Sequence, residues 1–168
     1  YDPPMPGIRD ALTQHMPAGY VIKLQVIFKT RWWRDAGLSG CVINISDEMD
    51  YPVALTYDVT ENIGLVGFIA GKKAVHWAQQ SEEERKNAVL RQYARTFDVS
   101  ESFLHEQCIF YLDRDWSQED YSRGAYESYA TPGALYNYGE ALRKQIHRIH
   151  FAGSVCSVDW YGYMDGAV

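Results

Sequence analysis

The chain has 168 residues, enough to bury one hydrophobic core, and its length alone predicts a single domain. With 46% hydrophobic residues, 23% charged residues and a formal net charge of −6, its composition is that of a globular protein and argues against binding nucleic acid through a basic face. No stretch has the roughly 18 apolar residues of a membrane span, and no signal peptide is visible, so the sequence assigns no location but favours an intracellular, cytoplasmic one, and no membrane segment is expected in these residues.

The cysteines and histidines carry no metal-binding pattern. Cys41, Cys108 and Cys156 are odd in number and widely separated, which favours reduced thiols over a disulfide. The five histidines are equally scattered, and no pair has metal-ligand spacing. The sequence therefore predicts no metal site.

The chain begins with a helix followed by a strand. Apolar residues recur at helical spacing from Ile8 to Met16, and Pro-Ala-Gly at 17–19 ends that helix. Residues 20–29 alternate between an apolar and a more polar face, as in a half-buried strand. Lys23 is on the more polar face, so we expect its side chain to point away from the core.

Three more strands are expected at residues 40–46, 53–57 and 63–70. The short turns between them favour antiparallel pairing. The strand at 63–70 is apolar on both faces, which indicates a central position in the sheet.

Two helices follow these strands. The first is short, at residues 72–79, and the second begins at Ser81, where Ser81 and Glu84 have the spacing of a capping box. Apolar positions between Val89 and Phe97 form the stripe that this second helix is expected to bury.

The last part of the chain predicts a strand, a long loop and a closing strand–helix unit. The strand is expected at 104–112, and the Tyr-, Gly- and Ser-rich residues up to Tyr138 are interpreted as an ordered loop lining a site. Residues 149–152 look like a short apolar strand, Gly153 like a turn, and the remainder like a helix cut off by the chain end. A strand that delivers a helix N-terminus is typical of a cofactor site, because unpaired backbone N–H groups point at the ligand.

One set of motifs runs in order along nearly the whole chain. It comprises Gly19-Tyr-Val-Ile-Lys23, Trp33-Arg34, and the segments 116–126, 129–133, 138–143, 148–153 and 160–168. In this order the motifs closely resemble the C-terminal half of flavin-containing monoamine oxidases, so the chain is expected to be a piece of a longer protein.

The resemblance implies an α+β fold with a mixed, largely antiparallel sheet backed by helices, which is the amine-oxidase substrate domain. A C-terminal strand–helix piece of an α/β FAD-binding domain is expected to follow it. On this basis residues 1–145 are expected to be part of the substrate-binding domain, and residues 146–168 the returning segment of the FAD-binding domain. The dinucleotide-binding pattern Gly-x-Gly-x-x-Gly does not occur in this sequence.

The same resemblance assigns three catalytic candidates. Lys23 resembles the lysine that holds a water near flavin N5, and Tyr126 and Tyr163 resemble the two tyrosines whose rings form an aromatic cage for the amine. From the residues alone, Lys23 would be a solvated strand lysine and both tyrosines packing residues, so these roles depend on the family match.

Cofactor contacts are implied at further positions. Trp116 resembles a tryptophan packed near the flavin ring, and the Met164 backbone N–H is expected near the flavin pyrimidine oxygen, where negative charge grows on reduction. Gly153 permits close backbone approach, and the Ser154 hydroxyl is placed to hydrogen-bond the cofactor.

Two positions depart from the family pattern. Ala125 stands where animal monoamine oxidases carry the cysteine that links FAD covalently, so non-covalent FAD is expected. Ser154-Val-Cys156 stands where the family usually has Thr-Glu-Thr, so Val155 removes an acidic group from the cofactor's surroundings.

Two functions follow from these observations. The first is a part of an FAD-dependent amine oxidase that converts a primary or secondary amine to an imine and aldehyde, with molecular oxygen as second substrate and hydrogen peroxide as product. The isolated piece is expected to be inactive, no nucleic-acid partner is expected, and a homodimer is a candidate assembly. The alternative is a non-catalytic or diverged amine-oxidase-like binding module without competent FAD binding, for which Val155 and the missing dinucleotide pattern argue.

Overall fold

The computed structural model describes residues 2–59, 63–125 and 127–168, which pack into two compact units. The sheet unit is the continuous segment Tyr20–Arg123, and the terminal unit combines the residues up to Gly19 with Gly124–Val168. The boundary expected at residues 145 and 146 lies inside the terminal unit. The assignment of 1–145 to a substrate-binding domain and of 146–168 to an FAD-binding domain stays a prediction.

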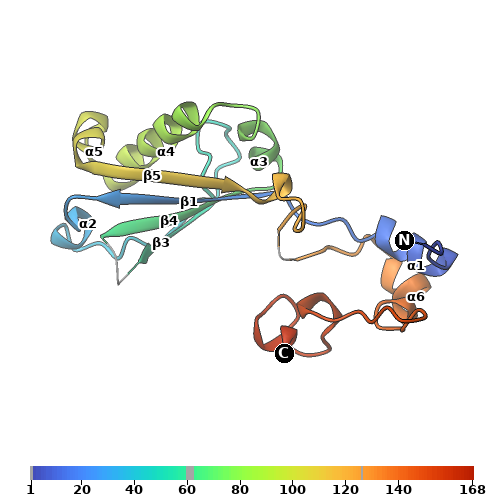
Figure 1. Ribbon diagram of the computed structural model, residues 1–168. Coiled ribbons are helices and arrows are strands. Elements are labelled where there is room, and N and C mark those ends of the chain that lie inside the picture. The colour runs from blue at the N-terminus through green and yellow to red at the C-terminus, as the bar shows by residue number, and fades with distance from the viewer. Residues whose placement is uncertain (1, 60–62, 126) are drawn as a thin grey trace. The chain divides into compact units, whose positions relative to one another are not determined.

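The sheet unit contains a five-stranded sheet in the order β2-β3-β4-β1-β5 (Figure 1). Its strands are β1 (Val21–Phe28), β2 (Val42–Ile43), β3 (Leu55–Val59), β4 (Gly64–Ala70) and β5 (Cys108–Asp115). The named pairings are all antiparallel, and β4 is the central strand, as its apolar sequence predicts. The α+β class with a largely antiparallel sheet is therefore confirmed.

Helices cover one face of this sheet (Figure 1). The helical elements of the sheet unit are α2 (Trp32–Asp35), α3 (Lys72–Trp77), α4 (Glu82–Phe97), α5 (Glu101–Gln107) and the 3-10 turn η1 (Trp116–Gln118). The Ser81 capping box is present at the start of α4, because the Ser81 side chain accepts from the Glu84 N–H and the Glu84 carboxylate accepts from the Ser81 N–H. The stripe from Val89 to Phe97 is buried as predicted.

The alternation of β1 decides which of its side chains enter the core. Ile22, Leu24, Val26 and Phe28 are fully buried, and they pack in one hydrophobic cluster with residues of α4. Lys23 is exposed on the opposite face, as the sequence predicts. The period of two along a strand thus separates a packing face from a face that is available to a ligand.

A buried ion pair joins α4 to β5. The Arg85 guanidinium donates to both carboxylate oxygens of Asp113, at 2.6 and 2.8 Å, and the Tyr111 hydroxyl donates to the same carboxylate at 2.9 Å. The side chains of Arg85 and Asp113 are only 13% and 4% exposed. The hydrogen bond with Asp113 raises the pKa of Arg85 above its ordinary value. This ion pair fixes the helix layer to an outer strand of the sheet.

Lys73 holds the connection between β2 and β3. Its ammonium group donates to the backbone carbonyls of Ser46, at 2.6 Å, and Tyr51, at 2.7 Å, while the residue is 6% exposed. Burial lowers the pKa of Lys73, and the charge of Asp47 opposes that shift. One buried ammonium group therefore binds the β2–β3 connection at two places, Ser46 and Tyr51.

We expect Lys73→Met to lower the free energy of unfolding by about 1–3 kcal/mol, because two carbonyls lose their donor. The folded-state pKa of Lys73 is below its unfolded value. At pH values between the two, the unfolded chain therefore binds more protons than the folded chain. The contribution of Lys73 to stability consequently rises with pH in that alkaline window. Urea denaturation at several pH values checks this. Lys72→Met is the control, because the Lys72–Asp47 pair is exposed. A stability difference that shrinks as pH rises would contradict the assignment.

Before the closing residues, two segments differ in type from the sequence prediction. Residues 104–107, expected as strand, belong to α5, because the Ser100 hydroxyl caps the helix by accepting from the Phe103 N–H at 3.1 Å. The segment expected as a loop up to Tyr138 contains α6 (Ala134–Tyr138), which begins after Gly133 with a φ of 83°. Short helices of this kind carry too few apolar positions to show a period.

The closing residues form two 3-10 turns in place of the expected strand and α-helix. Ile149 pairs only with Ile146 among the described residues, through bonds within a single turn, so it gains no strand neighbour. The turns are η3 (Ser154–Cys156) and η4 (Asp165–Ala167). Positive φ values at Trp160 (54°) and Gly162 (80°) interrupt a helical repeat between them.

The terminal unit is built around α1 (Gly7–Gln14) and α6, with the 3-10 turn η2 (Gly139–Ala141). The Arg9 guanidinium donates to the carbonyls of Ala141 and Leu142, both at 2.9 Å, and lies 3.6 Å over the Phe151 ring. One side chain of the N-terminal helix thus holds the C-terminal segment.

Candidate functional site

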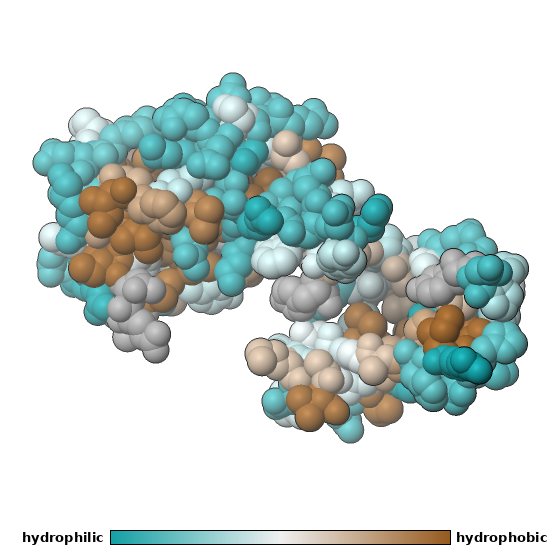
Figure 2. Space-filling model, in the orientation of Figure 1, coloured by the Kyte–Doolittle hydropathy of each residue, from teal (hydrophilic) through white to brown (hydrophobic). Residues whose placement is uncertain are grey.

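The face of the sheet opposite the helices is apolar and exposed. The strand registers place on this open face Ile27, Ile43, Leu55, Tyr57, Val66, Phe68, Phe110 and Leu112, together with Lys23 and Gln25. Ile43 is 76% exposed, and Phe110 and Leu112 are about half exposed. Figure 2 shows hydrophobic side chains gathered on the sheet unit below its hydrophilic helices. Contiguous apolar surface of this kind typically marks a site that binds a ligand or contacts another part of a protein.

Lys23 and Trp116 share one depression on this open face, although they lie far apart in the sequence. The depression has a volume of about 190 Å³ and is lined by Lys23, Gln25, Leu112, Arg114 and Trp116. Lys23 is paired with Arg114 across β1 and β5, and its ammonium nitrogen lies 5.8 Å from the centre of the Phe68 ring. The Lys23 cation thus lies near the Phe68 ring and shares the depression with the partly exposed Trp116.

Local hydrogen bonds position Trp116 at the end of β5. The Asp115 carboxylate accepts from the Ser117 N–H at 2.9 Å and from the Ser117 hydroxyl at 2.7 Å, which turns the chain into η1. Arg114 is paired with Glu119 across this turn. The positive charge of Arg114 is therefore neutralised, and Lys23 is the cation of the depression without a salt-bridge partner among the described residues.

In the terminal unit, Ala125 lies in a backbone ladder between residues 15–19 and 125–131. The Ala125 N–H donates to the Gly19 carbonyl at 2.7 Å, and the Gly19 N–H donates to the Glu127 carbonyl at 3.3 Å. A Cβ at Gly124 would lie 2.5 Å from the Ala18 Cβ, so only glycine fits there. The predicted residue Tyr126 lies outside the described residues.

The remaining predicted positions lie in the closing segment of the terminal unit. Tyr163 and Met164 are largely exposed, and the Tyr163 ring meets the Trp160 ring edge-on at 5.9 Å. Gly153 has a φ of 114° and open space where a Cβ would be, and Ser154 begins η3 directly after it. The closing segment therefore exposes aromatic side chains, and it leaves open space beside the backbone of Gly153.

Val155 lies inside a cleft of the terminal unit. This cleft is lined by Arg9, Leu12, Thr13, Met16, Ser128, Leu142 and Val155. Val155 is half-buried, and the cleft around it contains polar as well as apolar side chains.

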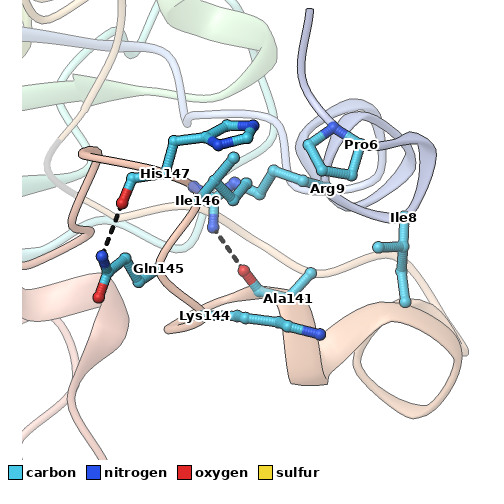
Figure 3. Close-up of a pocket in the computed structure, with 8 residues that line it drawn as sticks. All are labelled: Pro6, Ile8, Arg9, Ala141, Lys144, Gln145, Ile146 and His147. Atoms are coloured by element: carbon cyan, nitrogen blue, oxygen red, sulfur yellow. Dashed lines mark hydrogen bonds between the residues drawn. The ribbon is translucent and has the colours of Figure 1, made fainter.

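A second cleft in the terminal unit has a volume of about 250 Å³ (Figure 3). Its lining consists of Pro6, Ile8, Arg9, Ala141, Lys144, Gln145, Ile146 and His147. Two of the polar side chains drawn there bind within the unit, since Arg9 donates to the Ala141 carbonyl and the Gln145 amide donates to the His147 carbonyl at 2.6 Å. We assign this cleft to the packing of the N-terminal helix.

Several residues near the predicted sites were missed by sequence reasoning. Gln25 could have been found from the alternation of β1, whereas Leu112 and Arg114 required the register of β5 against β1. Glu127, which lies against Gly162 in the terminal unit, had no signal in the sequence.

Other kinds of site are not found in the described ranges. Among residues 2–59, 63–125 and 127–168 no group of His, Cys, Asp and Glu could hold a metal ion. The three cysteines are free thiols. None of the helices described reaches the length and hydropathy of a membrane span.

A family profile and known protein sequences both match this chain over its whole length. A family profile described as flavin containing amine oxidoreductase matches residues 1–168. The chain is 43% identical to a probable flavin-containing monoamine oxidase A of Dictyostelium discoideum and 36% identical to a flavin-containing amine oxidase of Danio rerio. Both alignments cover 100% of this chain but only 36% and 32% of those proteins, so the chain spans about a third of the length of these relatives.

Solved structures give the same result. A wild-type putrescine oxidase bound to putrescine superposes with a TM-score of 0.84 at 34% identity. Cyclohexylamine oxidase from Brevibacterium oxydans IH-35A superposes with a TM-score of 0.83 at 30% identity. Each match covers 99% of this chain and 36% of the other chain.

Proposed function

Because this chain belongs to the family of flavin-containing amine oxidoreductases, we propose that it is part of a longer FAD-dependent amine oxidase. The proposed reaction converts an amine, oxygen and water to an aldehyde, the released ammonia or amine, and hydrogen peroxide. The observation that carries this proposal is the meeting of Lys23 and Trp116 in one depression on the open sheet face. The proposed substrate is a primary or secondary amine.

The residues present fit a flat aromatic cofactor. A flavin ring needs apolar surface for its faces and hydrogen-bond donors at its edge. Trp116 offers an exposed indole beside the Lys23 ammonium group, and the terminal unit exposes Trp160, Tyr163 and Met164. These large side chains are costly to leave in water, which supports a role in contacting a ligand or the rest of the protein.

Each proposed residue has a physical task. FAD, when bound, supplies the two-electron oxidation of the amine and the transfer of those electrons to oxygen. Lys23 would hold a water by hydrogen bonding and stabilise negative charge in its depression. Tyr126 and Tyr163 would orient the uncharged amine between their rings, and the Met164 N–H would donate to the flavin ring. Gly153 and Ser154 would contact the cofactor chain.

The test of this proposal is direct. The full-length protein is purified, its visible absorbance is scanned for flavin, and peroxide release is measured with a panel of amines. Flavin absorbance with peroxide release supports an oxidase. Colourless full-length protein that releases no peroxide supports the alternative, a non-catalytic binding module, for which Val155 is the motivating residue.

Non-covalent FAD is a second testable part of the proposal. Alanine at position 125 has no nucleophile that could link to the flavin. We expect acid precipitation of the flavin-loaded wild type to release all of the flavin into the supernatant. The variant Ala125→Cys supplies a thiol at that position and is expected to retain flavin in the pellet, while Ala125→Ser serves as a control of similar size. Flavin in the wild-type pellet would contradict the assignment.

A further inference from the structure

The closing segment of the terminal unit contacts the segment that carries Glu127. The Tyr161 hydroxyl donates to the Ser128 carbonyl, and a Cβ placed at Gly162 would overlap the Glu127 carboxylate. The backbone of Gly162 therefore lies directly against the Glu127 side chain. Its φ of 80° suits glycine, so the turn can be this close only with glycine at 162.

Glu127 is itself held in place from two sides. Its backbone carbonyl accepts from the Gly19 N–H at 3.3 Å, within the ladder that includes the Ala18–Ser128 bridge. Its carboxylate accepts from the Tyr129 hydroxyl at 3.1 Å. Among the ion pairs in the described ranges, none includes Glu127. The Glu127 side chain thus lies between the backbone ladder and the Gly162 turn.

The Gly162 turn, which contacts the Glu127 side chain, also carries Tyr163. The Tyr163 N–H donates to the Trp160 carbonyl at 3.0 Å, and the two rings meet edge-on. Burial, and next the charge of Glu127, raise the pKa of Tyr161. A shift of the Gly162 backbone would move Tyr163, because the two residues share a peptide unit.

We propose that Glu127 is a positioning residue, which sets the place of Tyr163 by packing against Gly162. This inference rests on the proposed function, in which Tyr163 orients the amine. Glu127 touches neither substrate nor cofactor in this role. It acts through shape, since its carboxylate and side-chain carbons fill the space above the glycine.

The test uses Glu127→Ala, Glu127→Gln and Tyr163→Ala in the full-length protein. Glu127→Ala is expected to lower kcat/KM for the amine by about 10- to 100-fold, because small misplacements of an orienting group have effects of this size. Glu127→Gln keeps the volume and an acceptor for Tyr129, so it is expected to remain within about threefold of wild type. In a Tyr163→Ala background, Glu127→Ala is expected to change kcat/KM less than about twofold, since a residue that acts through Tyr163 has nothing left to position.

A readout independent of activity is hydrogen exchange at the Tyr163 amide. Its rate is expected to rise about tenfold in Glu127→Ala and to stay unchanged in Glu127→Gln and in the exposed control Glu140→Ala. Unchanged exchange in Glu127→Ala, or effects on kcat/KM that multiply in the Tyr163→Ala background, would overturn the proposal. If the wild type oxidises no amine, the proposed function fails, whereas the exchange rates still decide whether Glu127 positions Tyr163.

Discussion

Replacing Asp113 with asparagine is expected to lower the free energy of unfolding by about 3–5 kcal/mol, the largest stability effect that we predict for a single polar substitution. The Arg85 guanidinium would stay buried without its counter-charge, while the Tyr111 hydroxyl would keep a possible acceptor. Asparagine preserves the shape of the site, but its NH2 group cannot accept from Arg85, so the loss reports the charge together with one of the two hydrogen bonds. Urea denaturation of wild type and variant at neutral pH measures it.

Two comparisons make this prediction specific. Glu83→Gln breaks the exposed Lys86–Glu83 pair on the same helix and is expected to cost at most about 1 kcal/mol. The double variant Arg85→Met and Asp113→Leu removes both charges but leaves the Tyr111 hydroxyl and the Gln80 carbonyl without these partners, so it is expected to recover part of the lost stability. A loss below about 1 kcal/mol in Asp113→Asn would show that the ion pair does not fix α4 to β5.

Replacing Lys23 with methionine is expected to reduce amine oxidation by the flavin-loaded full-length protein by about 100- to 1,000-fold, the effect typical of losing one fixed electrostatic donor. Methionine keeps the length and apolar contact of the side chain while removing the ammonium group. Lys23 is exposed on the open sheet face, so thermal stability should not change. Steady-state peroxide release and anaerobic reduction by the amine separate the two halves of the reaction.

The matched control is Lys29→Met, which removes a lysine just beyond the same strand. Its pair with Glu106 is long, at 4.0 Å, and exposed, so activity is expected to stay within about twofold of wild type. Activity of Lys23→Met within threefold of wild type would remove Lys23 from the proposed mechanism. Loss of bound flavin at unchanged stability would move its role from the reaction to cofactor binding.

Long periodic elements were predictable because their packing repeats along the sequence. The alternation of β1 placed Lys23 opposite the core, and the Ser81 capping box located the start of α4. The elements that differed are short and decided at single positions. Ser100 capped α5 where a strand was expected, and α6 is only five residues long.

The candidate site likewise has features that the sequence predicts and features that depend on the tertiary structure. Lys23 and Trp116 could be named from motifs, but their joint depression depends on the antiparallel register of β1 and β5, which sets Lys23 beside Arg114. The closing residues could not be derived from local pattern, because Trp160 and Gly162 adopt positive φ values and Gly162 lies against the distant Glu127. Glu127 became visible only through its contact with Gly162.

By itself the sequence determined the family, the fold class and the core face of β1, because motif order and hydrophobic period are properties of the linear chain; the site residues that it names stay predictions. The tertiary structure alone decided strand order and register, the burial of Arg85 with Asp113, and the packing of Glu127 on Gly162. Each of these joins residues far apart in the chain, where no local period constrains which side chains meet.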